Sequence, residues 1–284
     1  MPTPAAHQPD IPGEVYLCRV HETLSCAACC GLYNVADTSR RGLEQMLQHR
    51  TKLFAQVPRT LNAILSYREN IERRESQLRP FAGFHHCPYI GFVGRSVGCL
   101  LHPRAEGNEG VDWRGLSDYG GMACRIYFCP TYHGLANRHK AIARDVAQNW
   151  YDYGLVITET RLLDSIFRRV EARIERSLRK EDVACNSEFA GALDALLHLK
   201  LRWPYRDPRS SLCHYFFKDQ QHLKANIDYD ALKTRPSTYD TILVELNSTF
   251  QSAWELRQAE AELDRLFGRL TVALTAGSGS RTLS

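Results

Sequence analysis

The chain lacks the features that mark membrane, secreted and strongly charged proteins. It contains no run of about 18 apolar residues, the length that a membrane-spanning helix needs. Met1 to Pro12 has neither the basic start nor the apolar segment of a secretory signal. The 36 basic and 32 acidic residues give a net charge of only +4, too mild to indicate a nucleic acid or an anionic membrane as partner. We therefore expect a cytoplasmic protein, in which disulfides are rare.

The motifs of several common enzyme classes are also missing. There is no nucleophile elbow, no Gly-x-x-x-x-Gly-Lys phosphate loop, no dinucleotide fingerprint and no His-Glu-x-x-His pair. The Gly277-Ser278-Gly279-Ser280 stretch is a low-complexity tail. Glu260 and Glu262 are interpreted as solvated partners of nearby arginines on one helix. The sequence therefore indicates neither a reaction nor a substrate.

Cysteine, by contrast, is abundant and unevenly placed. Of the ten cysteines, eight lie before residue 130, and only Cys185 and Cys213 follow. A disulfide framework is typical of shorter secreted domains, and scattered core cysteines would not gather in one half of a chain. We interpret the cluster as metal ligands. The predicted ligands are Cys26, Cys29, Cys30, Cys87, Cys99, Cys124 and Cys129, with Cys18 as an eighth.

The donor chemistry narrows the choice of metal. Cys26-x-x-Cys29 has the spacing with which a tight turn offers two thiolates to one metal, and Cys30 adds a third. Thiolates are soft donors that favour zinc or iron, including an iron–sulfur cluster, over magnesium or calcium. Two metals, or one [4Fe–4S] cluster with spare thiols, would account for more than four ligands. Eight ligands would match two tetrathiolate sites.

A different interpretation is that the cysteines are reduced thiols packed as small hydrophobic residues. It suits Cys185 and Cys213, which lie among apolar residues in the sequence. The eight earlier cysteines favour ligation instead, because the glycine-rich segment from Phe81 to Pro130 needs a clamp to become ordered.

The cysteine pattern resembles the YkgJ-type cysteine-cluster family, also described as the zinc- or iron-chelating CxxCxxCC domain. The matching segments are Cys26-x-x-Cys29-Cys30, Cys87-Pro88-Tyr89-Ile90, Cys99-Leu100-Leu101-His102-Pro103 and Cys124-Arg125-Ile126-Tyr127-Phe128-Cys129. The resemblance covers about residues 14 to 135. The family's first cysteine would fall at Thr23, so Cys18 would have to replace it, and Ala105 to Gly121 would be an insertion. The resemblance implies chelation of zinc or iron, without a settled reaction.

Histidines are weaker ligand candidates. Cys99-x-x-His102 has ligand spacing, and His86 directly precedes Cys87. His21 and His133 lie near cysteines without such spacing. For all four histidines, the alternative to metal ligation is a ring that is hydrogen-bonded within the protein or exposed to solvent. Arg125 lies between two predicted ligands and is a candidate for neutralising thiolate charge.

The predicted fold is mainly α, with a loop-rich, metal-stapled cysteine module packed with a helical C-terminal half. The predicted domains are a disordered N-terminus at 1–13, a cysteine-cluster domain at 14–135, a helical region at 136–275 and a flexible tail at 276–284. A strand is expected at 14–20. Apolar periodicity and capping residues predict helices at 37–56, 60–77, 134–150, 160–179, 187–201 and 237–273.

Three classes of function remain open on the sequence. The first, which we favour because the ligand set is the strongest signal, is a metal-binding protein with a structural or metal-handling site. The second is an iron–sulfur redox protein or enzyme, because some larger proteins that resemble this family join the motif to methyl transfer. The third is a zinc-stabilised interaction module whose helical half binds a protein partner or a second copy of the chain.

Overall fold

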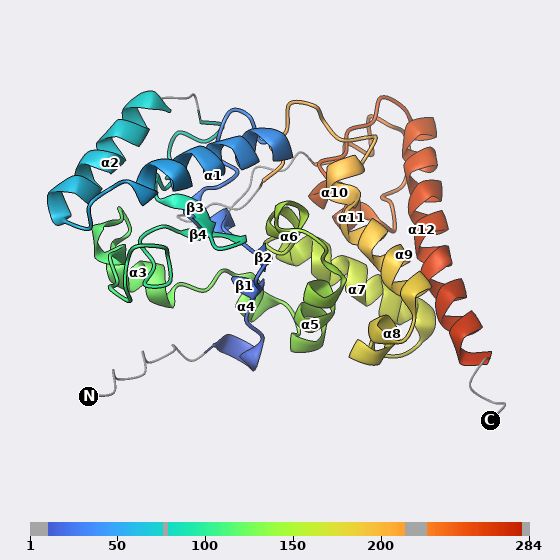
Figure 1. Ribbon diagram of the computed structural model, residues 1–284. Helices are drawn as coiled ribbons and strands as arrows, with labels where there is room; N and C mark the ends of the chain where they lie inside the picture. Colours follow the sequence, from blue (N-terminus) through green and yellow to red (C-terminus); the bar gives the residue numbers. More distant parts are fainter. Residues whose placement is uncertain (1–10, 76–78, 214–225, 280–284) are drawn as a thin grey trace. The chain divides into compact units, whose positions relative to one another are not determined.

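The chain folds into two compact units, each described here by itself. The computed structural model (Figure 1) describes residues 11–75, 79–213 and 226–279 of the 284-residue chain. Unit 1 comprises the chain up to His133 together with Asn149–Gly154, and unit 2 comprises Gly134–Gln148 and the chain from Leu155 onward. Helices dominate and the two sheets have two strands each, which confirms a mainly α fold. In the described ranges, none of the helices is both long and apolar enough to cross a membrane.

Two helices form one side of unit 1. They are α1 (Arg40–Ala55) and α2 (Leu61–Arg74). The side chain of Thr60 caps α2 at the predicted start. The helix predicted from residue 37 begins later, because Ser39 caps α1 and Asp37 accepts the backbone N–H of Ser39 at 2.9 Å. Phe54 and Tyr67 join the two helices edge-to-face, with ring centres 5.0 Å apart.

The cysteine-bearing half of unit 1 has more regular structure than expected. The predicted loop at 81–130 contains the antiparallel hairpin β3 (Ile90–Val93) and β4 (Ser96–Cys99), which packs on α1. The strand predicted at 14–20 is displaced, because η1 (Pro12–Glu14) precedes a short strand, β1. The remaining short elements are β1 (Arg19–His21), β2 (Leu24–Ser25), η2 (Ala28–Cys30), η3 (Arg114–Leu116), α3 (Gly120–Ile126) and α4 (Thr131–Gly134).

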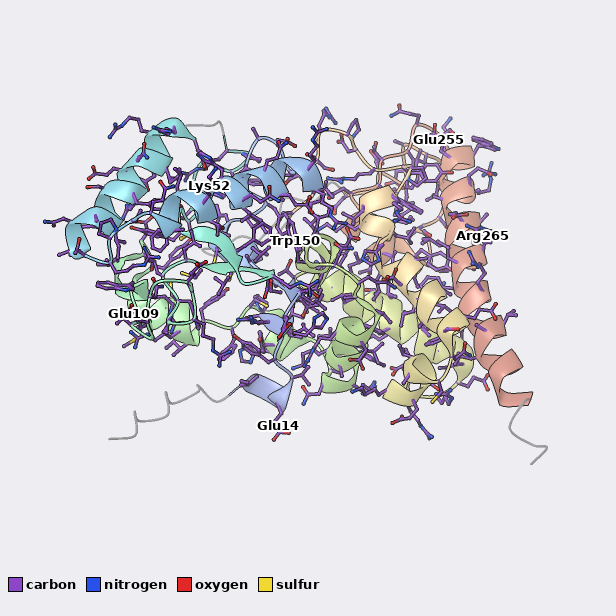
Figure 2. The ribbon with its side chains drawn as sticks, viewed as in Figure 1. Glu14, Lys52, Glu109, Trp150, Glu255 and Arg265 are labelled. Atoms are coloured by element: carbon purple, nitrogen blue, oxygen red, sulfur yellow. The ribbon has the colours of Figure 1, made fainter. Side chains whose placement is uncertain are left out.

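A returning segment completes unit 1. The helix predicted at 134–150 is in fact two, α5 (Asn137–Val146) and α6 (Trp150–Val156), and the start of α6 belongs to unit 1. Trp150, labelled in Figure 2, packs edge-on against Phe92 with ring centres 6.3 Å apart. The hydroxyl of Tyr153 donates to the carbonyl of Leu17 at 2.8 Å. These contacts fasten residues 149–154 to β3 and to the segment that precedes Cys18.

Unit 2 is built from helices whose ends depart from the predicted ones. Its elements besides α5 are α7 (Thr160–Ile174), α8 (Lys180–Ala184), α9 (Ser187–Leu197), α10 (Leu199–Arg202), α11 (Asp240–Glu245) and α12 (Ala253–Gly279). The helix predicted at 160–179 stops early because Glu175 adopts a left-handed conformation, with φ at 55°. The single helix predicted at 237–273 is divided, because Asn247 also has φ at 55° and ends the turn after α11.

The terminal helix α12 provides much of the core of unit 2. It packs against α9 and α7 (Figure 1) and buries one apolar face, which includes Leu256, Leu263, Phe267 and Leu270. It continues to Gly279, past the start predicted for the flexible tail.

A buried ion pair also lies inside unit 2. Lys200 on α10 is 2% exposed and Glu159 is 4% exposed. The Lys200 ammonium contacts the Glu159 carboxylate and donates to the carbonyl of Leu155 at 3.1 Å. Because charges are costly to bury unless they are paired, this contact holds the start of α7 to α10.

We predict that Lys200→Met destabilises unit 2 by about 3–5 kcal/mol, because it leaves the Glu159 carboxylate buried without its ammonium partner. The double variant Lys200→Met/Glu159→Gln should recover much of the loss. Lys180→Met serves as the control, since its pair with Asp145 is exposed and is worth about 1 kcal/mol or less. Chemical denaturation measures all three, and an unchanged Lys200→Met variant would contradict the prediction.

Candidate metal centre

Four of the eight predicted ligands form a first thiol group, made of Cys18, Cys26, Cys29 and Cys129. Every pair within this set interacts electrostatically, since each thiolate affects the pKa of the others. The backbone shows why they meet. The N–H of Cys26 donates to the carbonyl of Cys18 at 2.8 Å across the β1–β2 turn. Cys18, the ligand whose spacing departs from the family pattern, therefore lies with the other three.

Tyr132 brings Cys129 to this group. Its hydroxyl accepts the backbone N–H of Leu17 at 2.7 Å and lies 3.4 Å from the sulfur of Cys18. Its own N–H donates to the carbonyl of Cys129 at 2.9 Å. Tyr132 is 2% exposed, so a buried hydroxyl ties the last cysteine of the sequence cluster to the first. Sequence reasoning missed this residue, whose only signal is its position three residues after Cys129.

The other four cysteines form a second thiol group, made of Cys30, Cys87, Cys99 and Cys124. Each of these thiols interacts electrostatically with at least two others in the set. The N–H of Cys87 donates to the carbonyl of Cys30 at 2.9 Å, and the β3–β4 hairpin pairs Ile90 with Cys99. Because Cys87 lies three residues before β3 and Cys99 ends β4, the hairpin brings both thiols to the same end.

Cys124 reaches the second group from a separately held element. It lies on α3, none of whose residues is buried. Its sulfur is 3.0 Å from the hydroxyl of Ser117, and the Arg114 guanidinium donates to its carbonyl at 3.4 Å. Arg114 also lowers the pKa of the Cys99 and Cys124 thiols. Arg125, the predicted charge-neutralising residue, instead pairs with Asp112 at 2.9 Å and is half-exposed.

The two groups meet at the adjacent residues Cys29 and Cys30. The Cys30 thiol donates to the Cys29 sulfur, which lowers the pKa of Cys29 and raises that of Cys30. Cys29 interacts with the thiols of the first group and Cys30 with those of the second, so the dipeptide contributes one sulfur to each group. The Cys-Cys pair of the sequence therefore joins the two groups.

A glycine allows the two ligand loops to approach closely. Gly31 has φ at 80°, and a Cβ atom there would lie 2.2 Å from the carbonyl oxygen of His85 and 2.8 Å from the Cα of His86. No other residue fits this contact, which places Cys30 beside Cys87.

Arg50 on α1 holds the same two loops from the core side. Its side chain is 1% exposed, and it donates to the carbonyl of Cys87 at 3.1 Å and pairs with the Glu75 carboxylate. A second donation reaches Nε2 of His86 at 2.7 Å, and Nδ1 of that ring lies 2.6 Å from the carbonyl of Gly31. The guanidinium therefore links both ligand segments to α1, and nothing in the sequence distinguished it from other helical arginines.

The contacts of the candidate histidines show which of their ring nitrogens are already engaged. Burial, reinforced by Arg50, lowers the pKa of His86 to about 3, so its ring is neutral, and both of its nitrogens are engaged. His86 is therefore a positioning residue rather than a donor. His102 is also neutral, because burial lowers its pKa to about 4, and its Nδ1 accepts the N–H of Arg104 at 3.1 Å. The ring of His21 is used locally, by Thr23, and His133 is exposed.

The two late cysteines differ from each other. Cys213 is buried, as expected for a reduced core thiol. Cys185 is exposed at the end of α8, which makes the burial expected for it wrong. The apolar residues around it in the sequence, such as Val183, turn inward while Cys185 itself ends the helix.

Desolvation governs the acidity of the grouped thiols. Burial raises the pKa of Cys18 and Cys99 to about 12 and that of Cys129 to about 11. It also raises the pKa of Cys26, Cys87 and Cys124. Without a cation nearby, most of these sulfurs are therefore protonated at neutral pH.

The donor set fits a thiophilic metal, while the positions of the sulfurs do not form a complete coordination shell. In the ranges that the structure describes, no three histidine, cysteine, aspartate or glutamate side chains are arranged so that they could hold a metal ion. Ligation would therefore require rotations of the cysteine side chains within each group. Metal binding stays a prediction.

Comparison with known proteins adds nothing to these observations. No protein-family model, curated protein or solved structure matches the chain. The resemblance to the YkgJ-type family, like the zinc or iron that it implies, also stays a prediction.

We predict that Arg50→Met destabilises unit 1 by about 3–5 kcal/mol, because it leaves the Glu75 carboxylate, the Cys87 carbonyl and Nε2 of His86 without their buried donor. Arg40→Met is the matched control on the same helix, since its pair with Glu44 is exposed and is worth about 0.5 kcal/mol. Denaturation of both variants measures the difference. Equal stabilities would show that Arg50 does not hold the ligand loops.

We also predict slow alkylation of Cys18, Cys99 and Cys129, the grouped thiols whose pKa burial raises to about 11–12, in the metal-free, reduced protein. At pH 8 a thiol of pKa 11–12 is almost entirely neutral, whereas an ordinary thiol, of pKa about 8.5, is partly ionised. Mass spectrometry after iodoacetamide treatment should find Cys185 modified first. Modification of Cys18 and Cys99 should rise about tenfold per pH unit between pH 8 and 10.

The same pKa values fix how the stability of the metal-free fold depends on pH. A thiol whose pKa is raised by folding binds its proton more tightly in the folded state, so stability falls as pH rises above about 8.5. Rapid alkylation of Cys99 at pH 7, or stability that increases from pH 8 to 10, would contradict the assigned burial.

Proposed function

We propose that this protein binds two metal ions through two tetrathiolate sites. Cys18, Cys26, Cys29 and Cys129 would ligate the first ion, and Cys30, Cys87, Cys99 and Cys124 the second. One observation carries the proposal: most electrostatic interactions among the eight thiols fall within two sets of four, with Cys29 and Cys30 divided between the sets, and Cys29 also raises the pKa of Cys124 across them. Four thiolates suit tetrahedral zinc, and the same donors suit iron or an iron–sulfur cluster.

Charge supports the proposal at the second group. Four thiolates and a divalent cation carry a net charge of −2, which is costly to bury. Arg50 and Arg114 lie close enough to lower the pKa of thiols in that group, so they would offset this charge. When bound, the metal would itself keep the thiols ionised, and the protons displaced from them would appear in solution.

The role that we infer is structural or metal-handling. The short elements η3 and α3, between Cys99 and Cys129, bury none of their residues, and metal–thiolate bonds would offset the entropy lost in ordering this segment. We infer no catalysed reaction. An iron–sulfur centre would instead favour the redox or methyl-transfer alternatives.

The metal content tests the proposal. Protein purified without oxygen should carry two metal ions per chain. Cys26→Ser and Cys87→Ser should each lower this to one, because each removes a ligand from a different group. Cys185→Ser should keep both ions, since that exposed thiol belongs to neither group. Elemental analysis gives the number, and circular dichroism checks that each variant is folded.

The outcomes separate the alternatives. Colourless protein with two zinc ions would support two structural or metal-handling sites. Absorption near 400 nm, together with bound iron and sulfide, would favour the redox and methyl-transfer alternatives. Loss of both ions from the folded Cys26→Ser variant would show one shared cluster instead of two sites. If the purified protein contains no metal and all its thiols react as free thiols, the proposal is wrong.

A further inference from the structure

Unit 2 has a surface pocket that the metal proposal does not use. It has a volume of about 300 Å³ and lies between α7 and the segment that enters α11. Its lining is mainly cationic and hydroxyl-bearing, with no carboxylate. The lining residues are Ser165, Arg168, Arg169, Ala172, Thr238, Tyr239, Thr241 and Ile242.

Arg169 is held in place without an acidic partner. Its guanidinium stacks over the ring of Tyr239, 4.3 Å from the ring centre, and donates to the hydroxyl of Thr238 at 2.9 Å. These two contacts fix its orientation at the pocket. An arginine oriented in this way keeps donors available for an anion at little further entropic cost.

The other arginines on the same helix differ from it. Arg168 pairs with Asp164 at 2.7 Å, and Arg173 pairs with Asp264 at 2.5 Å. Within the described ranges, no carboxylate lies in ion-pair contact with Arg169, and Asp264, which pairs with Arg173, offsets part of its charge from outside the pocket lining. The positive charge at the pocket is therefore incompletely neutralised by the protein itself.

Hydroxyl groups complete the donor set. In the part of the chain that the structure describes, the side chains of Ser165 and Thr241 have no hydrogen-bond partner, although both line the pocket. They lie on α7 and α11, on the two sides of the cavity. Ala172, with its small side chain, leaves room beside Arg169.

We propose that this pocket binds a phosphate monoester. A guanidinium matches two phosphate oxygens in one plane, and neighbouring hydroxyl groups donate to the remaining oxygen. The volume is at the small end of the range for ligand pockets, about 300–1,000 Å³, which suits a small phosphorylated metabolite better than a dinucleotide. The site lies wholly within unit 2 and does not depend on the metals.

Calorimetry on the full chain at low ionic strength tests the proposal, with glycerol 3-phosphate, inorganic phosphate and acetate as probes. The phosphate monoester should bind at least as tightly as inorganic phosphate, and acetate more weakly than both. Arg169→Gln should weaken binding of the ester about tenfold or more, because it removes a charged donor. Arg257→Gln, on α12 outside the pocket, should leave binding unchanged.

A second variant distinguishes the loss of a ligand contact from a loss of packing in unit 2. Thr241→Val keeps the shape of an exposed side chain and removes only its hydroxyl, so it should weaken binding severalfold without unfolding unit 2. Absence of binding by either phosphate probe to the intact protein would overturn the proposal. Equal binding of acetate and the ester, or binding unaffected by both pocket variants, would also overturn it.

Discussion

Eight thiols that interact with one another and have lost part of their hydration cannot all carry negative charge unless a positive charge shares the space. Each thiolate raises the pKa of its neighbours, and loss of hydration raises it further. Unit 1 can therefore avoid repulsion among its thiolates in two ways. It keeps the sulfurs protonated, or it ionises them around cations. The fold depends on this constraint because the segments bearing the sulfurs include short elements with little core of their own.

The positions of the sulfurs are determined by polar groups that are not sulfurs. Arg50 ties the segments of Cys30 and Cys87 to α1, and Tyr132 ties Cys129 to Cys18. Both side chains are buried, and both contact backbone groups of the ligand segments. Such contacts place a ligand segment before any metal is present, so the two groups are organised by the fold rather than by ligation alone.

Much of the helical structure was predictable from periodicity and capping, and the site was predictable only in its residue types. The helix predicted from Thr60 begins there, because the Thr60 side-chain oxygen accepts a free N–H of its first turn. The left-handed conformations of Glu175 and Asn247 were missed, because non-glycine residues rarely adopt them and only tertiary packing selects them there. The grouping of the thiols was also beyond the sequence, since it follows from long-range backbone bonds such as that between Cys30 and Cys87.

The two thiol groups differ in how firmly their last member is held. Three cysteines of the second group are placed by the hairpin and by the contact at Gly31, whereas Cys124 lies on a seven-residue helix without a buried residue. An isolated helix of that length is unstable in water, and α3 relies on Ser117, Arg114 and an exposed ion pair. Every segment of the first group, by contrast, is tied by a buried hydroxyl or a strand bond. If both groups hold metals, the second would therefore open more easily, with Cys124 as the ligand that leaves first.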